Sequence, residues 1–547
     1  MASFSLSGNI IDIVARRIYS GTITVSDGFI SFIKEEPLDP SFPYIMPGFI
    51  DSHIHIESSM LIPSEFARLA VVHGTVATVS DPHEIANVLG LDGIEFMLAN
   101  SRSVPFKFFF GAPSCVPATG FESAGASITP NDIEHLLARD DIYYLSEMMN
   151  YPGVLLEFPD VQSKLTSAIR HKKPVDGHAP GLSGSDLVKY TRSGISTDHE
   201  CFTLEEALEK INLGMKILIR EGSAARNFDA LHPLLASHPD LLMFCSDDRH
   251  PDDLINSHIN ELVKRSLELG YDLFDVLRAS SFNANQHYNL NVGLLQIGDP
   301  ADFIVVDNLD SLNVIKTFIS GNLLADNSIS LIQPVNADPV NNFNIEDLNL
   351  SDLSIKSKNT HIRVIEAIDG QLVTGEIIEK PKIINNNIIS DTDKDILKIA
   401  VVNRYQKSPV SIGFIKNFKL SRGALASSIA HDSHNIIAVG VSDEELLEAV
   451  NIIIQNKGGI SVVDGENTNY LSLPFAGLMS CDDGYKVAEK YHQLNSIARS
   501  LGCPFESPFM TLSFMALLVI PKLKLSDKGL FDSTTFDFVD LNVSGSN

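Results

Sequence analysis

Eight short apolar segments recur between residues 46 and 247, and helix-length amphipathic stretches separate several of them. Segments of this length are typical of buried strands, and their alternation with helices is typical of parallel sheets. Eight such strands favour an α/β fold of the (β/α) barrel type. The segments are residues 46–51, 74–80, 106–111, 142–147, 174–177, 194–198, 215–220 and 241–246.

Strand patterns also flank this region. Residues 21–33 are expected to form a hairpin that turns at Ser26-Asp27-Gly28. Residues 293–307 and 314–320 are strand-like again, with Gly298-Asp299 as the turn. We expect these flanks to pair into a small β-sandwich domain. Beyond a polar, Asn- and Asp-rich stretch, the chain has strand patterns at 399–404, 436–441 and 459–463 and helix patterns at 442–456 and 484–501.

The expected organisation has four parts. They are a small β domain of residues 1–45 and 288–335, a barrel of residues 46–287, a linker of residues 336–359, and a separate C-terminal α/β or α+β domain of residues 360–547.

The charge balance argues against several classes of partner. With 41 Lys and Arg against 69 Asp and Glu, the formal charge is −28, so nucleic acid and anionic membrane surfaces are not expected partners. The first residues lack a secretory-signal pattern, and no apolar run reaches the roughly 18 residues of a membrane span, so we expect a cytoplasmic protein. Five cysteines without a CxxC pair predict free, mostly buried thiols.

Four histidines follow apolar segments. His53 and His55 lie two residues apart in Asp-Ser-His-Ile-His, and alternate residues of a strand face the same side. His178 and His199 follow two later segments, 21 positions apart. A single His-x-His motif often arises by chance, but four imidazoles at strand ends can hold two divalent cations.

Two carboxylates complete the predicted metal site. Glu147 ends the fourth segment and can bridge two cations, although a solvated carboxylate at a helix start is the alternative. Asp247 follows the eighth segment and can both bind a metal and accept a proton from water, whose pKa falls from about 16 to about 7 on a metal ion. The predicted ligands are His53, His55, Glu147, His178, His199 and Asp247.

Other polar residues also lie near strand ends. Asp81 and His83 follow the second segment, where a buried polar turn is one interpretation. Arg220 follows the seventh segment and can be a structural salt-bridge partner. Three further carboxylates near strand ends are Glu84, Glu200 and Glu221.

A dense polar group also occurs far from the barrel. In the C-terminal region, His431, Asp432 and His434 lie between apolar strand patterns. They can cap the active site across a domain interface, bind a further ion, or form an ordinary polar turn.

Several other catalytic patterns are absent from the sequence. His83-Glu84 continues to Asn87 rather than to the second histidine of HExxH. No PCxxC, GxSxG or GxxxxGK[ST] motif occurs, which argues against the PCxxC zinc deaminases, serine hydrolases and P-loop proteins.

Several longer sequence motifs resemble those of a known family. PGFIDSHIHIE, GHAPG, TDHE and Asp247 resemble the amidohydrolase superfamily, whose members are metal-dependent hydrolytic barrels with a small β domain. SDPHEIANVLG, LSEMMNYPGV, CSDDRHPDDL and IAHDSHNIIAVG are similar to the bacterial adenine deaminases, and the resemblance runs from about residue 21 to 532. Many amidohydrolases bridge their metals with a carboxylated lysine, whereas Glu147 takes that place here. Ser257-His258 and Gln286-His287 depart from the family pattern, away from the predicted ligands.

The resemblance implies hydrolytic deamination of adenine to hypoxanthine and ammonia in purine salvage, with Mn or Fe as the two cations and Zn as an alternative. Asp247 would move a proton from water to the departing amine, and Glu84, Glu200 or Glu221 would protonate the purine ring. Asp81, His83, Arg220 and Glu221 would contact adenine, and the protein would be a homo-oligomer. Two alternatives are another amidohydrolase, acting on a cyclic amide or a different aminopurine, and a non-catalytic binding protein. Loss of ligands would be expected in the latter, and none is lost here.

Overall fold

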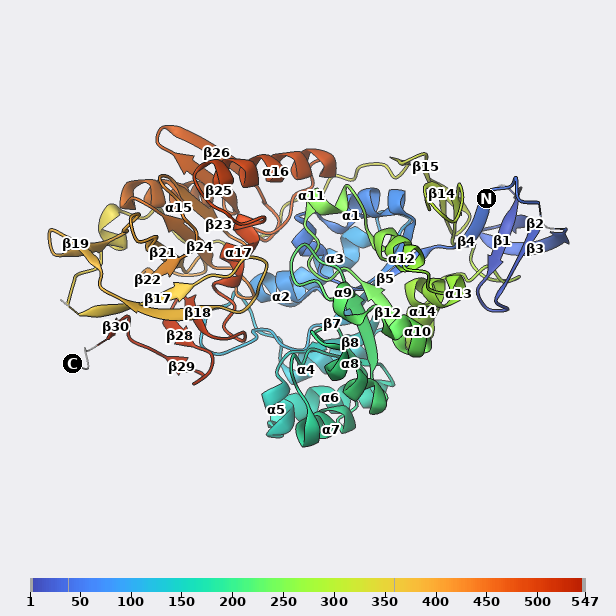
Figure 1. Ribbon diagram of the computed structural model, residues 1–547, viewed down its shortest axis with the longest axis horizontal. Helices are drawn as coiled ribbons and strands as arrows, with labels where there is room; N and C mark the ends of the chain where they lie inside the picture. The colour runs from blue at the N-terminus through green and yellow to red at the C-terminus, as the bar shows by residue number, and fades with distance from the viewer. Residues whose placement is uncertain (1–2, 38, 359, 544–547) are drawn as a thin grey trace.

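The computed structural model describes residues 3–37, 39–358 and 360–543 and shows three units in a row (Figure 1). A small β unit lies at one end, a barrel in the middle and a C-terminal unit at the other end. The expected domain limits at residues 1, 359 and 547 lie outside the described residues.

The small β unit is one continuous eight-stranded sheet built from both flanks of the barrel. The predicted hairpin is present, because β2 and β3 pair antiparallel on either side of Asp27 and Gly28. Instead of forming two separate sheets, the single sheet curls until Phe4 stacks on Phe318 at 5.4 Å. In spatial order the strands are β16 (Ile329–Ser330), β15 (Asn322–Asp326), β14 (Val314–Ile319), β13 (Phe303–Val306), β4 (Tyr44–Pro47), β1 (Phe4–Asp12), β2 (Arg17–Ser26) and β3 (Phe29–Glu36).

The predicted turn at Gly298-Asp299 is present, since Gly298 has a φ of 95° and Pro300 has no backbone N–H to donate. Of the residues 293–307 predicted to be strand-like around this turn, Phe303–Val306 form strand β13 of this sheet.

Five parallel barrel strands form one sheet and three form another, as expected for an α/β barrel. Two isolated parallel bridges close the ring, one between Val175 and Ile195 and one between Ile54 and Asp247. The barrel strands are β5 (Phe49–Ile54), β6 (Thr75–Ser80), β7 (Lys107–Ala112), β8 (Ile142–Met148), β9 (Val175–Gly177), β10 (Thr197–Asp198), β11 (Lys216–Arg220) and β12 (Leu242–Cys245).

The prediction of one strand over residues 46–51 is wrong, because this segment is divided between two sheets. Strand β4 pairs with β13 in the small β unit, whereas β5 begins at Phe49 and continues through His53. Gly48 joins them, and a Cβ atom there would lie 2.2 Å from Val76 Cγ1 of β6. The Val76 side chain packed against the backbone at this position therefore leaves room only for glycine.

Amphipathic helices cover the outside of the barrel. For example, α6 begins with Pro159, ends before Lys172 in the left-handed conformation, and buries Val161, Leu165 and Ala168. The longer helices of this unit are α1 (Pro63–Ala70), α2 (His83–Leu89), α3 (Leu91–Ser101), α4 (Pro130–Leu137), α6 (Pro159–His171), α7 (Gly184–Arg192), α8 (Leu204–Asn212) and α12 (Ile259–Glu268).

The C-terminal unit is built on a nine-stranded mixed sheet. Helices α15 (Asp443–Gln455) and α16 (Gly484–Ser500) pack against the sheet, close to the two predicted helix positions. Helix α17 (Pro508–Phe514), which was not predicted, also contacts the sheet. Along the main path the strands are β18 (Gly375–Glu379), β17 (His361–Glu366), β22 (Ser411–Lys416), β21 (Leu397–Val402), β24 (Ile436–Gly440), β23 (Ala424–Ser427), β25 (Gly459–Asp464) and β26 (Asn467–Ser472), and β30 (Asn542–Val543) pairs with β17.

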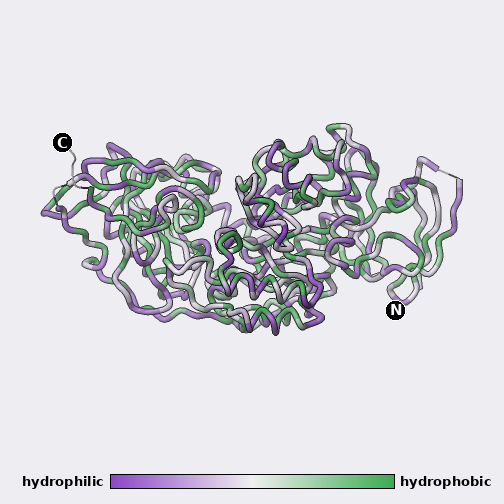
Figure 2. The backbone as a smooth tube through the Cα atoms, turned by 90° about the horizontal axis from the view of Figure 1, so that it is seen from below, coloured by the Kyte–Doolittle hydropathy of each residue, from purple (hydrophilic) through white to green (hydrophobic). Residues whose placement is uncertain are grey.

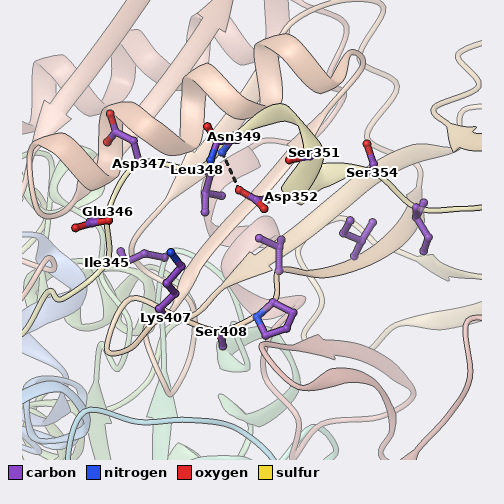
Figure 3. A pocket seen from close by; sticks show the side chains of 14 residues that line it. Ile345, Glu346, Asp347, Leu348, Asn349, Ser351, Asp352, Ser354, Lys407 and Ser408 are labelled. Atoms are coloured by element: carbon purple, nitrogen blue, oxygen red, sulfur yellow. Dashed lines mark hydrogen bonds between the residues drawn. The ribbon is translucent and has the colours of Figure 1, made fainter.

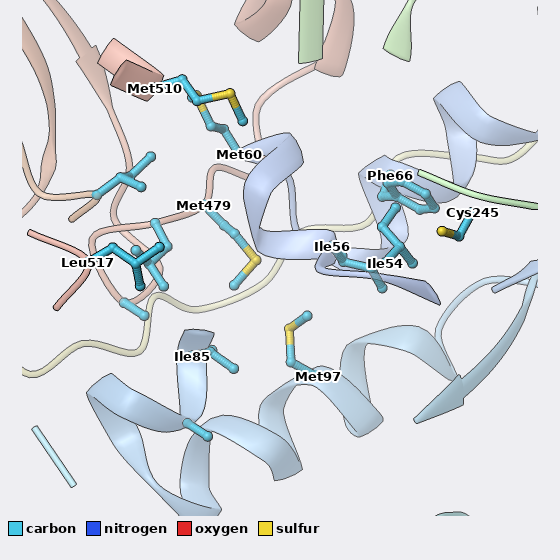
Figure 4. Packing of buried hydrophobic residues seen from close by; sticks show 14 of the residues in the cluster. Ile54, Ile56, Met60, Phe66, Ile85, Met97, Cys245, Met479, Met510 and Leu517 are labelled. Carbon is cyan, nitrogen blue, oxygen red and sulfur yellow. The ribbon is translucent and has the colours of Figure 1, made fainter. Parts of the chain in front are cut away.

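The barrel and the C-terminal unit share one hydrophobic core. Met60 from the barrel lies among Met479, Met510 and Leu517 from the C-terminal unit (Figure 4). The connecting segment is also packed, because Asn342 donates to the carbonyl oxygen of Val88 at 3.2 Å. The two units are therefore held together by extensive burial of apolar side chains.

Hydrophilic and hydrophobic residues are interleaved along the chain (Figure 2). Within the described ranges, no helix is both long and apolar enough to cross a membrane. All five cysteines are free and four are buried, as predicted.

Candidate active site

The predicted histidines and carboxylates converge at the carboxyl ends of the barrel strands, around a cavity of about 50 Å³. The cavity is covered by side chains from the C-terminal unit, including Phe514, Leu517 and Ile520. The predicted site residues that line it are His55, His83, Glu84, Glu147, His178, His199, Glu200, Arg220, Asp247, His431 and Asp432.

His53 and His55 are fixed by β5 and by the turn that follows it. His55 Nδ1 lies 3.1 Å from the carbonyl oxygen of Asp81, which fits donation from Nδ1–H and leaves Nε2 free to face the cluster. Nε2 of His55 lies 3.2 Å from Asp247 Oδ1, and Nε2 of His53 lies 3.5 Å from the same oxygen.

Glu147 lies at the centre of the cluster, at the end of β8. Its Oε1 is 3.3 Å from His55 Nε2, whereas its Oε2 is 2.8 Å from His178 Nδ1 and 3.3 Å from His199 Nε2. Burial opposes ionisation of Glu147, but hydrogen bonds from the three imidazoles outweigh it and hold the pKa of the carboxyl well below its usual range. The two oxygens of Glu147 thus face different histidines.

Asp247 follows β12, and its backbone N–H donates to the carbonyl oxygen of His53 at 2.9 Å. Arg220, the last residue of β11, lies 2.5 Å from Asp247 Oδ2 and also forms an ion pair with Glu200. Burial raises the pKa values of Asp247 and Glu200, but the Arg220 charge outweighs it and lowers both below their usual values. Arg220 therefore keeps two buried carboxylates ionised beside the histidines.

The remaining predicted residues fall into two groups. Asp81 and His83 are close to the cluster, because His83 Nδ1 lies 3.2 Å from Asp81 Oδ2 and 3.4 Å from Glu147 Oε1. Glu221 is directed away from the cavity and lies 3.0 Å from Arg265, so the structure does not bring it to the predicted site.

The polar turn of the C-terminal unit reaches the barrel. His431 Nδ1 lies 2.6 Å from Glu84 Oε1, and His434 forms a hydrogen bond with Glu84 Oε2. His83 Nε2 lies 3.9 Å from Asp432 Oδ1. Of the alternatives for this turn, the geometry favours a cap on the site across the interface.

Asp248, the residue after Asp247 and the alternative to it for proton transfer, lines the cavity and accepts a hydrogen bond from Ser58 at 2.5 Å. Sequence reasoning did not single out the apolar roof. The roof residues Leu372, Phe514, Leu517, Val519 and Ile520 carry no chemical motif, and only folding of the C-terminal unit brings them to the barrel mouth.

The donor set fits divalent cations. His53 is fully buried, and neither of its ring nitrogens has a hydrogen-bond partner in the described part of the chain. Buried polar atoms are normally paired, so an orphaned imidazole facing a carboxylate is consistent with a metal ligand. Several groups of close donor atoms meet here, among them His53 with His55 and Asp247, His53 with Glu147 and His199, His55 with Asp81, His83 and Glu147, and His178 with His199 and Glu200.

A larger groove in the C-terminal unit has a different character (Figure 3). It has a volume of about 600 Å³ and is lined by Glu346, Asp347, Asp352 and Lys407, without a histidine. It shares no lining residue with the histidine cluster, so its size does not make it the candidate site.

Two family models match the chain. The amidohydrolase family matches residues 44–324, and the adenine deaminase C-terminal domain matches residues 371–537. The chain is therefore an amidohydrolase, and its buried histidines and carboxylates indicate a divalent metal site.

Close relatives indicate which family of amidohydrolases this chain belongs to. The chain is 57% identical to an adenine deaminase of Methanosarcina mazei over 98% of each chain. It is 54% identical to that of Salinibacter ruber, covering 98% of this chain and 99% of the relative, and 50% identical to that of Borreliella burgdorferi, covering 99% and 100%. The chain belongs to the adenine deaminase family. A solved β-aspartyl dipeptidase from Fervidobacterium islandicum matches at 16% identity with a TM-score of 0.46, over 62% of this chain and 100% of that one.

Proposed function

We propose that this protein hydrolyses adenine to hypoxanthine and ammonia and that it acts in purine salvage. The observation that carries the proposal is a match to proteins named adenine deaminase over nearly the whole length of both chains. The buried donors around Glu147 supply the chemical setting that a hydrolytic reaction needs. We further propose that the protein is cytoplasmic and forms a homo-oligomer.

The proposed ligands of two divalent cations are His53, His55, Glu147, His178, His199 and Asp247, with Mn or Fe favoured and Zn as the alternative. Histidine and carboxylate sites accept all three metals, so the availability of each metal in the cell decides which one is bound. Divalent cations in this position supply Lewis acidity, which allows water to act as a nucleophile at neutral pH.

Asp247 is the proposed proton carrier. Its Oδ1 faces the histidines and its Oδ2 is held by Arg220, so the carboxylate is ionised and fixed in orientation. It accepts a proton from the attacking water and later delivers a proton to the departing amine. Arg220 acts by orienting Asp247 and Glu200.

Adenine is proposed to lie beneath the apolar roof, with Asp81 and His83 close to its polar edge. Glu84 and Glu200 both line the cavity and are the candidates for protonating the ring, whereas Glu221 is too far from the cavity for either proposed role.

Initial rates of ammonia release test this function. Enzyme loaded with Mn or Fe is assayed with adenine, adenosine, cytosine and guanine, and its metal content is measured separately. A pocket that matches the free base leaves polar groups unpaired or blocked with a nucleoside, so we expect adenine to be preferred by about 10⁴ or more. Equal rates with adenosine would contradict the free-base assignment, and hydrolysis of a cyclic amide without activity on purines would favour another amidohydrolase reaction.

A further inference from the structure

Two histidines of the C-terminal unit bond the same carboxylate of the barrel. His431 and His434 lie in the turn between β23 and β24, and Glu84 lies in the first turn of α2. His431 Nδ1 is 2.6 Å from Glu84 Oε1, and His434 Nε2 bonds Glu84 Oε2 across 350 residues of sequence. Each carboxylate oxygen therefore has its own imidazole from the other unit.

The tautomer of His434 follows from its second ring nitrogen. The backbone N–H of Ala430 donates to His434 Nδ1 at 3.4 Å, so Nδ1 carries no proton. The proton of the neutral ring is then on Nε2, which donates to Glu84. Burial lowers the pKa of His434 to about 4, which agrees with a neutral ring.

His431 differs in charge and is fixed by the roof. Burial favours its neutral form, but the Glu84 carboxylate outweighs burial and raises the pKa of His431 to about 9. Its ring stacks on Phe514 at 5.2 Å, and its backbone N–H donates to Ser513 Oγ at 3.3 Å. Phe514 itself lines the cavity. The roof is therefore in direct contact with His431, one of the two histidines that bond Glu84.

We propose that His431 and His434 are positioning residues, which orient Glu84 towards the ring of the bound substrate when the C-terminal unit covers the barrel. This inference rests on the proposed deamination of adenine and selects Glu84 over Glu200 as the ring acid. Glu200 is already held by Arg220, and its ion pairs among the described residues are all with residues of the barrel.

Two groups carry the protons of the reaction, namely Asp247 and the pair of His431 and Glu84. As water adds to C6, Asp247 takes one proton from it, and the proton held by His431 and Glu84 moves to ring nitrogen N1. When the C6–N bond breaks, Asp247 returns its proton to the amine, which leaves as ammonia. The proton of the C6 hydroxyl returns to Glu84 and His431, and hypoxanthine is left with a carbonyl at C6 and a proton on N1.

The test compares His434→Leu with His434→Gln in the full-length, metal-loaded protein. Leucine removes the donor to Glu84, and we expect kcat for ammonia release from adenine to fall by about 10- to 100-fold with little change in KM. Glutamine keeps an N–H donor and is expected to restore kcat to within about fivefold of the wild type.

The matched control is Tyr491→Phe. It removes another buried hydrogen bond between the same two units, which joins Tyr491 to His250 at 2.7 Å, and it leaves Glu84 untouched. We expect a normal kcat for this variant. If His434→Leu does not fold, as judged by its thermal unfolding midpoint, His431→Leu and His431→Asn provide the same comparison at Nδ1.

A double substitution separates positioning from a general structural effect. In a Glu84→Gln background, His434→Leu should cause no further loss of kcat, because His434 acts through Glu84. Multiplicative losses, or a normal kcat for His434→Leu, would overturn the inference. A wild type that releases no ammonia from adenine would instead overturn the proposed function.

Discussion

Asp247 shows how one side chain at a strand end can face two partners. Its backbone is fixed by the bridge to β5, so its carboxylate is directed between the histidines and Arg220. Oδ1 is available to a cation, whereas Oδ2 accepts from a guanidinium that prevents its protonation. The two roles proposed for Asp247, metal binding and proton transfer, are compatible because its two oxygens have different surroundings.

At this scale we predict the effect of Asp247→Asn. The amide keeps the shape and one oxygen ligand but removes the proton acceptor, so kcat should fall by about 10² to 10⁴ while the protein stays folded. Steady-state ammonia release measures kcat, and the thermal unfolding midpoint and metal content report on the fold and the site. Near-normal turnover, with a loss in Asp248→Asn instead, would assign proton transfer to Asp248.

The roof over the cavity shows what one element contributes. Lys524 of β27 (Leu523–Ser526) is completely buried and donates to the carbonyl oxygens of Leu372 at 2.6 Å and Phe514 at 2.9 Å. Both acceptors belong to residues that line the cavity. Lys524 thus ties together the two segments that form the roof.

The pH dependence of stability tests this role. Burial lowers the pKa of Lys524 to about 7, whereas an unfolded lysine titrates near 10.4. Keeping the ammonium buried is therefore costly below about pH 7. This cost fades as the pH rises from 7 towards 10, because in that range the unfolded chain binds more protons than the folded protein.

We accordingly expect the wild type to gain thermal stability relative to Lys524→Met as the pH rises from 7 to 10. The variant should also lose about 1 to 3 kcal/mol of stability, because the two carbonyl groups lose their donor. Unfolding midpoints at four pH values provide the measurement. A constant difference between the two proteins would show that Lys524 does not titrate in this range.

At the scale of the whole molecule, the barrel and the C-terminal unit are coupled by their common core. Met479 is completely buried in that core, near Met60 and Met510. The contacts of His431 and His434 with Glu84 cross the same interface. Packing that joins the units also completes the site.

We predict that Met479→Ala lowers the stability of both units together. Loss of a buried methionine side chain costs about 2 to 5 kcal/mol, so the unfolding midpoint should fall with one transition retained. Differential scanning calorimetry provides the measurement, and Leu156→Ala, at a side chain that is 68% exposed, is the matched control. Two separate transitions in the variant would show that the units fold independently.

Much of the fold and of the metal site could be predicted from the sequence because the signals are local. An apolar strand followed by His53 and His55 specifies both its own burial and the side to which the imidazoles point. Parallel strands then bring His178, His199 and Glu147 to the same end of the barrel without further information.

The tertiary structure decided what depends on distant segments. The division of residues 44–54 between β4 and β5 is set by pairing with β13, which is more than 250 residues away, and by the space beside Val76. Glu221 has the same local pattern as Glu200, yet pairing with Arg265 turns it away from the cavity. No local pattern could have distinguished these two carboxylates.

The sequence by itself determined the parallel-strand barrel and the identities of the histidines and carboxylates at its carboxyl end, because periodicity and residue chemistry are properties of short segments. Only the tertiary structure decided that Glu84 is held by His431 and His434 and that an apolar segment near residues 514–520 covers the site. These contacts join residues hundreds of positions apart. They form only when the free energy gained by burying the shared core outweighs the entropy lost in bringing the two units together.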